Sequence, residues 1–154
     1  MAAAASGVLY AVFAATSMWV TVTDLRTRRI PNRVIAIAAA AIVGCGAVSA
    51  FAAADARRWV WAAVAAAIYG GAAFALWLAV PNGAVGGGDV KLAPLIGFAT
   101  GWSGIDAAFG WAPIGIAAAA LAAVAWARFR RRDVLAFGPV LLAGAWIAIL
   151  ITWW

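Results

Sequence analysis

The chain has 154 residues, of which 68% are hydrophobic and 10% are charged, and its formal net charge is +6. Soluble domains are about 45–50% apolar and about 25% charged, so this composition excludes an ordinary soluble domain and predicts one membrane-embedded domain over residues 1–154. The absence of histidine excludes a Ser-His-Asp triad, a Cys-His pair and a HExxH zinc site. Cys45 is the only cysteine, which excludes an intrachain disulfide and a CxxC metal or redox site.

Six apolar segments follow one another along the chain, and most are long enough to cross a bilayer core as a helix. Pro31 breaks the helix after the first segment, and Asn32 can cap the next helix. The fourth segment is short and must tilt or thin the bilayer to cross it. Residues 83–88 before it are predicted to form a loop. The fold class predicted is all-α, a polytopic bundle of six transmembrane helices at about residues 6–22, 34–54, 59–80, 90–100, 105–126 and 134–154.

The positive charges predict how this bundle is oriented. If the connection after the first segment faces the cytoplasm, nine Lys and Arg residues lie on cytoplasmic connections, and only Arg57 and Arg58 lie outside. This asymmetry fits the positive-inside rule, so both termini are expected outside a cell inner (plasma) membrane. It also makes residues 90–100 a true crossing, because a re-entrant segment would put the Arg-rich stretch 128–132 outside. The positive charge therefore indicates topology, with the lipid bilayer as a partner and no nucleic acid.

Two aspartates stand at matching depths in this topology, Asp24 after the first segment and Asp89 before the fourth. An ionisable group at the edge of a membrane segment is a candidate functional residue. Asp24 could instead be a solvated residue at a helix end, and Asp89 could be a helix N-cap. Three glycines precede Asp89, whereas a cap needs a single turn residue. Glycines let another backbone approach closely, so the run predicts a slot for an extended peptide. These glycines are Gly86, Gly87 and Gly88.

Two carboxyl groups about 3 Å apart share one proton, because the like charge raises one of the two pKa values. The ionised member can then take a proton from water while the protonated member donates to a carbonyl oxygen, which is amide hydrolysis without a covalent intermediate. The helix that begins near Asp89 favours its ionised form, which makes Asp89 the base and Asp24 the acid. No metal and no other cofactor is expected in this chemistry.

The residues around the two aspartates resemble the prepilin peptidase (type IV leader peptidase) family of GxGD intramembrane aspartyl proteases. The resemblance rests on an aspartate followed by Ile-Pro-Asn, then Gly-Gly-Gly-Asp-Val-Lys-Leu, then Phe-Gly-Pro, at 24–32, 86–92 and 137–139. It implies that Asp24 and Asp89 are catalytic and that Lys91, Pro31 and Asn32 shape the site. It also implies a prepilin or pilin-like substrate whose short basic leader, followed by a hydrophobic helix, is cut at the cytoplasmic face.

The chain departs from the larger members of this family, which insert a cysteine-containing cytoplasmic domain near the first membrane segment and also N-methylate the new terminus. Here the connection after that segment has about ten residues. The resemblance is therefore to the short, peptidase-only members that serve Flp or Tad-type pili, and methyltransferase activity is predicted to be absent. Two other functions stay open. One is a small ion- or proton-coupled transporter that uses the same Asp pair near the bilayer midplane. The other is a non-catalytic subunit of a secretion machine.

Overall fold

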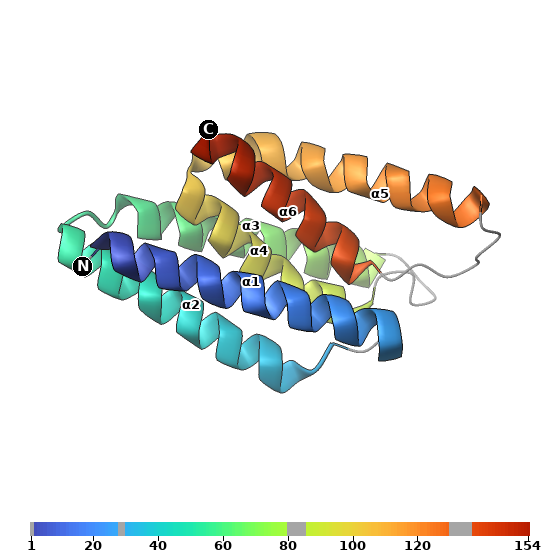
Figure 1. The fold of residues 1–154 in the computed structure, drawn as a ribbon, viewed down its shortest axis with the longest axis horizontal. Helices are drawn as coiled ribbons and strands as arrows, with labels where there is room; N and C mark the ends of the chain where they lie inside the picture. Colours follow the sequence, from blue (N-terminus) through green and yellow to red (C-terminus); the bar gives the residue numbers. More distant parts are fainter. Residues whose placement is uncertain (1, 28–29, 80–85, 130–136) are drawn as a thin grey trace.

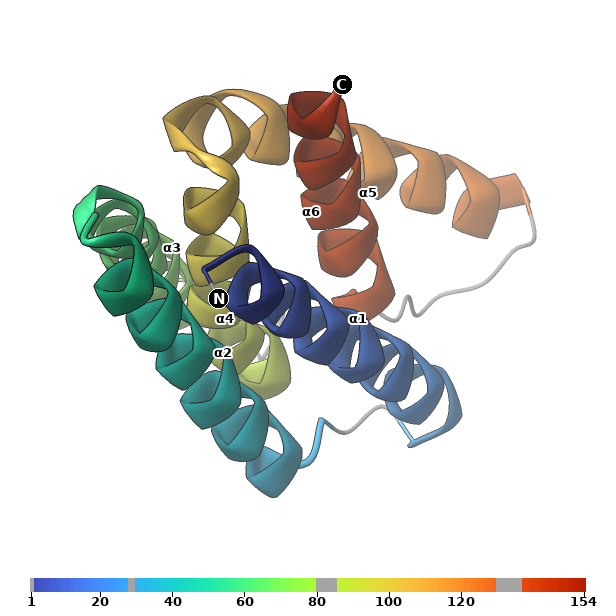
Figure 2. The ribbon, with the colours of Figure 1, turned by 60° about the vertical axis from the view of Figure 1, so that its left-hand side comes forward.

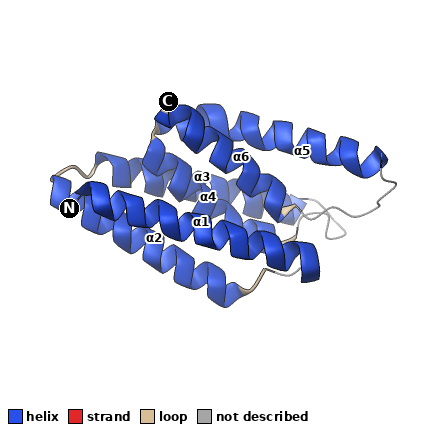
Figure 3. Cartoon of the chain, in the orientation of Figure 1, coloured by secondary structure: helices blue, strands red, loops and turns tan. Residues whose placement is uncertain are grey.

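The computed structural model describes residues 2–27, 30–79, 86–129 and 137–154. Every element in this part of the chain is helical, which confirms the all-α prediction (Figure 3). Both termini lie towards the same end of the bundle, as an even number of crossings requires (Figure 1). The elements are α1 (Ala2–Thr27), α2 (Asn32–Ala53), α3 (Arg57–Ala79), α4 (Gly87–Ser103), the π-helical segment η2 (Asp106–Trp111), α5 (Ala112–Phe129) and α6 (Gly138–Trp153).

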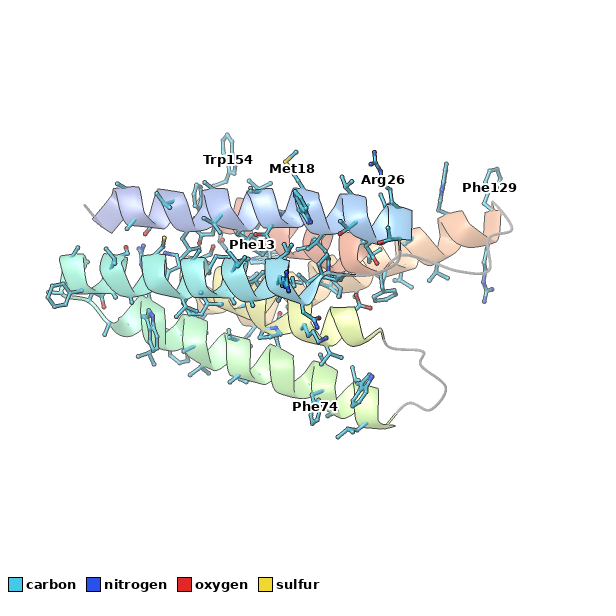
Figure 4. All side chains as sticks on the ribbon, turned by 90° about the horizontal axis from the view of Figure 1, so that it is seen from below. Phe13, Met18, Arg26, Phe74, Phe129 and Trp154 are labelled. Carbon is cyan, nitrogen blue, oxygen red and sulfur yellow. The ribbon has the colours of Figure 1, made fainter. Side chains whose placement is uncertain are left out.

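Four stretches are long and apolar enough to cross a membrane: Ala3–Thr27, Asn32–Ala53, Arg57–Ala79 and Asp106–Trp126. The remaining two helices are shorter, with 17 residues in α4 and 16 in α6. At 1.5 Å per residue α4 reaches about 25 Å, nearly the thickness of a bilayer core. Large apolar side chains cover the outside of the bundle, among them Met18, Phe74 and Phe129, which point away from it in Figure 4. Such a surface is stable only against lipid.

Helix α4 lies at the centre of the bundle, with α2, α3 and α6 around it (Figure 2). Its residues from Leu92 to Trp102 are almost all buried. Helix α3 packs closely along it because α4 has no side chain at two contact points. A Cβ added to Gly97 would lie 2.5 Å from the carbonyl oxygen of Ala65, and one added to Gly101 would lie 2.7 Å from Cα of Ala62. Small residues at such contacts let backbones approach, which is how helices associate in lipid.

Two details predicted around the helix starts near the aspartates differ from the structure. Helix α4 begins at Gly87, not after Gly88, so the predicted loop over 83–88 is wrong at its last two residues; positions 83–85 lie outside the described residues. Asn32 is not a cap, because Pro31 occupies the N-cap position of α2 and no side chain caps that helix. The carbonyl of Pro31 instead accepts hydrogen bonds from the N–H groups of Val34 and Ile35. In both cases the residue before the helix, Pro31 or Gly86, has an extended backbone, and no side chain caps the helix.

Candidate active site

The structure brings Asp24 and Asp89 to the same end of the bundle. Asp24 lies near the last turn of α1 and is only 7% exposed. Asp89 lies in the first turn of α4. Both side chains line one cavity of about 350 Å³, together with Ile30, Lys91 and the three glycines. Within the described chain, no hydrogen bond joins the two carboxyl groups.

Asp24 is held by a contact that sequence analysis did not find. The backbone N–H of Gly138 donates a hydrogen bond of 3.1 Å to Asp24 Oδ2. Gly138 is the first residue of α6, where helix N–H groups have no partner within the helix. A Cβ at this position would lie 2.9 Å from Asp24 Oδ2, so any other residue would require the carboxyl group to shift. The Phe-Gly-Pro motif at 137–139 had marked Gly138 as a residue of interest. Because Gly138 lies 114 residues from Asp24 in the sequence, the motif did not indicate that the two are in contact.

Asp89 is not the N-cap of α4, which excludes that alternative explanation of this residue. The cap is Gly86, whose extended backbone is followed by the hydrogen bond from Asp89 N–H to Gly86 C=O at 2.9 Å. Asp89 precedes residues 90–100, the stretch that the sequence predicts to cross the membrane. Burial raises the pKa of its carboxyl group above the ordinary value, and the charge of Asp24 raises it further. A backbone hydrogen bond at Gly86 opposes this rise.

The three glycines before Asp89 have different neighbours. Gly88 faces Ile30, and a Cβ there would lie 3.0 Å from the end of that side chain. Gly88 therefore lets α4 pack against the segment that links α1 to α2. Gly87 faces open space, and Gly86 lies against Asp89 Oδ2. All three line the cavity, which is compatible with the predicted slot for a peptide backbone.

Lys91 and Asn32 form a direct link between the two halves of the site. Lys91 Nζ donates a hydrogen bond of 2.8 Å to Asn32 Oδ1, which joins α4 to the first turn of α2. Pro31 starts α2 immediately before this contact. Of these three predicted site-shaping residues, only Lys91 lines the cavity, and Asn32 is linked to it through Lys91. Within the described residues, no group of three or more His, Cys, Asp or Glu side chains comes together as a metal site would require.

The fold and this site define a multi-pass helical membrane protein with two aspartates that line one cavity at one end of the bundle. A sequence model described as the type IV leader peptidase family matches residues 11–153, so the chain belongs to that family, as its motifs predicted.

A curated relative from Bacillus subtilis is named prepilin leader peptidase/N-methyltransferase. It is 32% identical to this chain over 139 residues, which are 90% of this chain and 54% of the relative. The chain thus spans about half the length of that relative. No solved structure matches the chain at a significant level.

Proposed function

We propose that this protein is an aspartic endopeptidase that removes the basic leader of a prepilin-like protein. One observation carries the proposal: two carboxyl groups from helices remote in sequence line a single cavity at one end of the bundle. A hydrolase that uses water needs a base to take its proton and an acid to protonate the carbonyl oxygen, and this pair provides both. Membership of the leader peptidase family and the name of the relative point to the same substrate class.

We assign the two roles from the environment of Asp89. Its raised pKa favours the protonated form, so Asp89 acts as the acid and Asp24 as the base. This is the opposite of the assignment that the helix N-terminus alone favours, because burial and the charge of Asp24 both raise the pKa of Asp89. In the reaction Asp24 takes a proton from water, the resulting hydroxide attacks the peptide carbonyl, and Asp89 donates its proton to the carbonyl oxygen. The gem-diol then collapses as its C–N bond breaks. Asp24 gives the proton that it took from water to the leaving amine, and a gem-diol hydroxyl returns a proton to Asp89.

The cytoplasmic location of the site follows from the charge asymmetry and stays part of the proposal. Arg26, Lys91 and Arg128 lie at the same end as the two aspartates, whereas Arg57 and Arg58 lie at the other. Positive residues concentrate on the cytoplasmic side of membrane proteins. The cleavage site would then be at the cytoplasmic face of the cell inner membrane.

We also propose that cleavage is not followed by N-methylation. Only residues 28–31 connect α1 to α2, which leaves no room there for an inserted cytoplasmic domain. Incubation of purified protein and cleaved substrate with radiolabelled S-adenosylmethionine tests this proposal. Label transferred to the new N-terminus would disprove it.

The proposed function is tested by co-expressing the protein with a candidate prepilin and following loss of the leader by gel shift. Wild type is expected to cleave, while Asp24→Asn and Asp89→Asn are each expected to lose cleavage and still insert in the membrane. Asp106→Asn is the matched control, because this exposed aspartate lies at the opposite end of the bundle. Cleavage retained in either site variant would reject the paired-acid mechanism.

A transporter remains a weaker candidate for the same residues. It requires carboxyl groups near the bilayer midplane, where a coupled ion would bind. Asp24 lies one turn from the end of α1, and Asp89 lies in the first turn of α4. Their position at helix ends favours chemistry at the membrane surface.

A further inference from the structure

A second, apolar hollow opens beside the site and ends at the same aspartate. Its volume is about 460 Å³, and its floor is α4, between α3 on one side and η2, α5 and α6 on the other. Asp89 lines this hollow and the catalytic cavity alike, so the two adjoin at that residue. We call the hollow the apolar groove; the residues used below are Ile68, Tyr69, Leu76, Phe109 and Pro113.

The groove is built by a hydrogen bond that replaces a missing backbone donor. In the π-helical segment each carbonyl accepts from the N–H five residues later, as Ala107 does from Ala112. Ala108 would accept from residue 113, but Pro113 has no N–H. The hydroxyl of Tyr69 donates to Ala108 C=O instead, at 2.6 Å, and so ties α3 to η2 across the groove.

Because its hydroxyl is bound in this way, Tyr69 presents its ring to the groove. The other groove residues are apolar apart from Asp89, which stands at one end. Ile68 and Leu76 are 50% and 56% exposed, so the groove opens on the lipid-facing surface. Between these two residues α3 covers about 12 Å, which is a little over two helical turns. The groove therefore runs from the level of the two aspartates towards the middle of the membrane.

We propose that the apolar groove receives the hydrophobic helix of the substrate, on the side of the scissile bond that lies in the membrane. The inference rests on the proposed function and adds to it the surface that selects the substrate. The shared lining residue Asp89, where the groove adjoins the catalytic cavity, favours this occupant over a lipid acyl chain. A peptide bond held at Asp89 continues into a polypeptide that must leave along the bilayer, and the groove starts at that point. An acyl chain has no group that would use the carboxyl at the end of the groove.

Site-directed cross-linking tests the occupant without requiring cleavage. The probe is a synthetic substrate in lipid vesicles, with a basic leader and an apolar helix of about 20 residues that carries one cysteine. The protein carries Cys45→Ala and Asp24→Asn, plus either Leu76→Cys or Leu78→Cys. These two leucines are 56% and 65% exposed on α3, but two residues apart they face opposite sides of the helix. We expect disulfide yield from position 76 to exceed that from position 78 by about tenfold.

Equal yields at the two positions would overturn the proposal. A photoactivatable phospholipid that labels position 76 while the substrate does not would also overturn it, in favour of an acyl chain. Failure of the proposed function is distinct, because it appears as wild type that does not cleave the probe although the Leu76→Cys variant cross-links it. The groove proposal fails separately if wild type cleaves and the cross-link is absent.

A second pair of variants links the groove to catalysis. Ala72 lines the groove and is exposed, so Ala72→Trp fills it without disturbing the core. Ala67 is also exposed on α3 but lies on the opposite face of the helix, which makes Ala67→Trp the matched control. We expect Ala72→Trp to raise KM by about tenfold with kcat unchanged, and the control to match wild type. Unchanged KM in Ala72→Trp would contradict the proposal.

Discussion

Among single residues, Gly138 has the contact that positions Asp24, and replacing it tests the geometry of the pair. An alanine here would place a methyl group 2.9 Å from Asp24 Oδ2 and push the carboxyl away from the cavity. A displacement of about 1 Å at a reacting group can cost about 100-fold in rate. We expect Gly138→Ala to lower kcat by about that factor with little change in KM. Cleavage assays over a range of substrate concentrations separate the two constants.

A matched control for this variant is Gly71→Ala. Gly71 is also helical, but an added Cβ would meet nothing within 4 Å. It is expected to cleave at the wild-type rate. If Gly138→Ala also cleaves at that rate, the contact with Asp24 has no part in catalysis.

The raised pKa of Asp89 predicts how stability depends on pH. The folded protein holds the Asp89 proton more tightly than the unfolded chain, so the folded state binds more protons. The unfolding free energy therefore falls as the pH rises from the ordinary Asp range to the folded pKa of Asp89. We expect Asp89→Asn to lose this pH dependence and to be more stable than wild type at neutral pH. Thermal unfolding in detergent at a series of pH values measures both effects, and a variant less stable than wild type at neutral pH would contradict them.

The same shift predicts the pH profile of cleavage. Activity needs one proton on the pair, so it falls at acid pH when both carboxyls are protonated and at alkaline pH when Asp89 ionises. Because the pKa of Asp89 is raised, the alkaline limb should lie above the ordinary range of an aspartic acid. A profile of kcat/KM against pH tests this. Activity that survives unchanged well into the alkaline range would exclude Asp89 as the acid.

At the scale of the elements, the hydrogen bond between Tyr69 of α3 and Ala108 of η2 can be tested. The test uses the backbone N–H that Pro113 lacks. Tyr69→Phe leaves the buried carbonyl of Ala108 without its hydrogen bond. An unsatisfied buried group costs about 1–3 kcal/mol, which is the loss we expect in unfolding free energy. Pro113→Ala restores a backbone N–H five residues after Ala108. In that background Tyr69→Phe should cost clearly less, and a double-mutant cycle measures the difference.

The result distinguishes two roles of Tyr69. If the cost of Tyr69→Phe is the same with and without Pro113, the tyrosine contributes by packing and not by replacing the proline N–H. If Tyr69→Phe costs less unfolding free energy in the Pro113→Ala background, Tyr69 and Pro113 together maintain the π-helical segment. The groove would then owe its shape to both residues.

The elements also show what the sequence could predict. Apolar segments and clusters of Arg indicate which stretches are helices, because they depend on composition over about 20 residues. The pairing of Asp24 with Gly138 could not be predicted, since it depends on how α1 and α6 pack. Asn32 is a good cap by type, yet Lys91 binds its side chain instead. Local preferences fail at these positions because a tertiary contact competes for the same atoms.

For the molecule as a whole, the orientation in the membrane decides whether the site can meet a substrate leader in the cytoplasm. Phe129 ends α5 at the end with the aspartates and is 79% exposed, and Ala56 lies exposed between α2 and α3 at the other end. In a Cys45→Ala background, Ala56→Cys should react with a membrane-impermeant maleimide added to spheroplasts. Phe129→Cys should react only after the membrane is opened, because the positively charged end is retained in the cytoplasm.

The reverse labelling pattern would place both aspartates outside the cell and remove the cytoplasmic part of the proposed function. The proposed topology puts three crossings, α3, α4 and α5, between the two positions. Labelling of both positions from one side would mean an even number of crossings between them, which would exclude α4 as a true crossing. Cleavage measured on the same variants shows whether each labelled protein is folded. Phe129 and Ala56 do not line the cavity or the groove, so both variants should process substrate as wild type does.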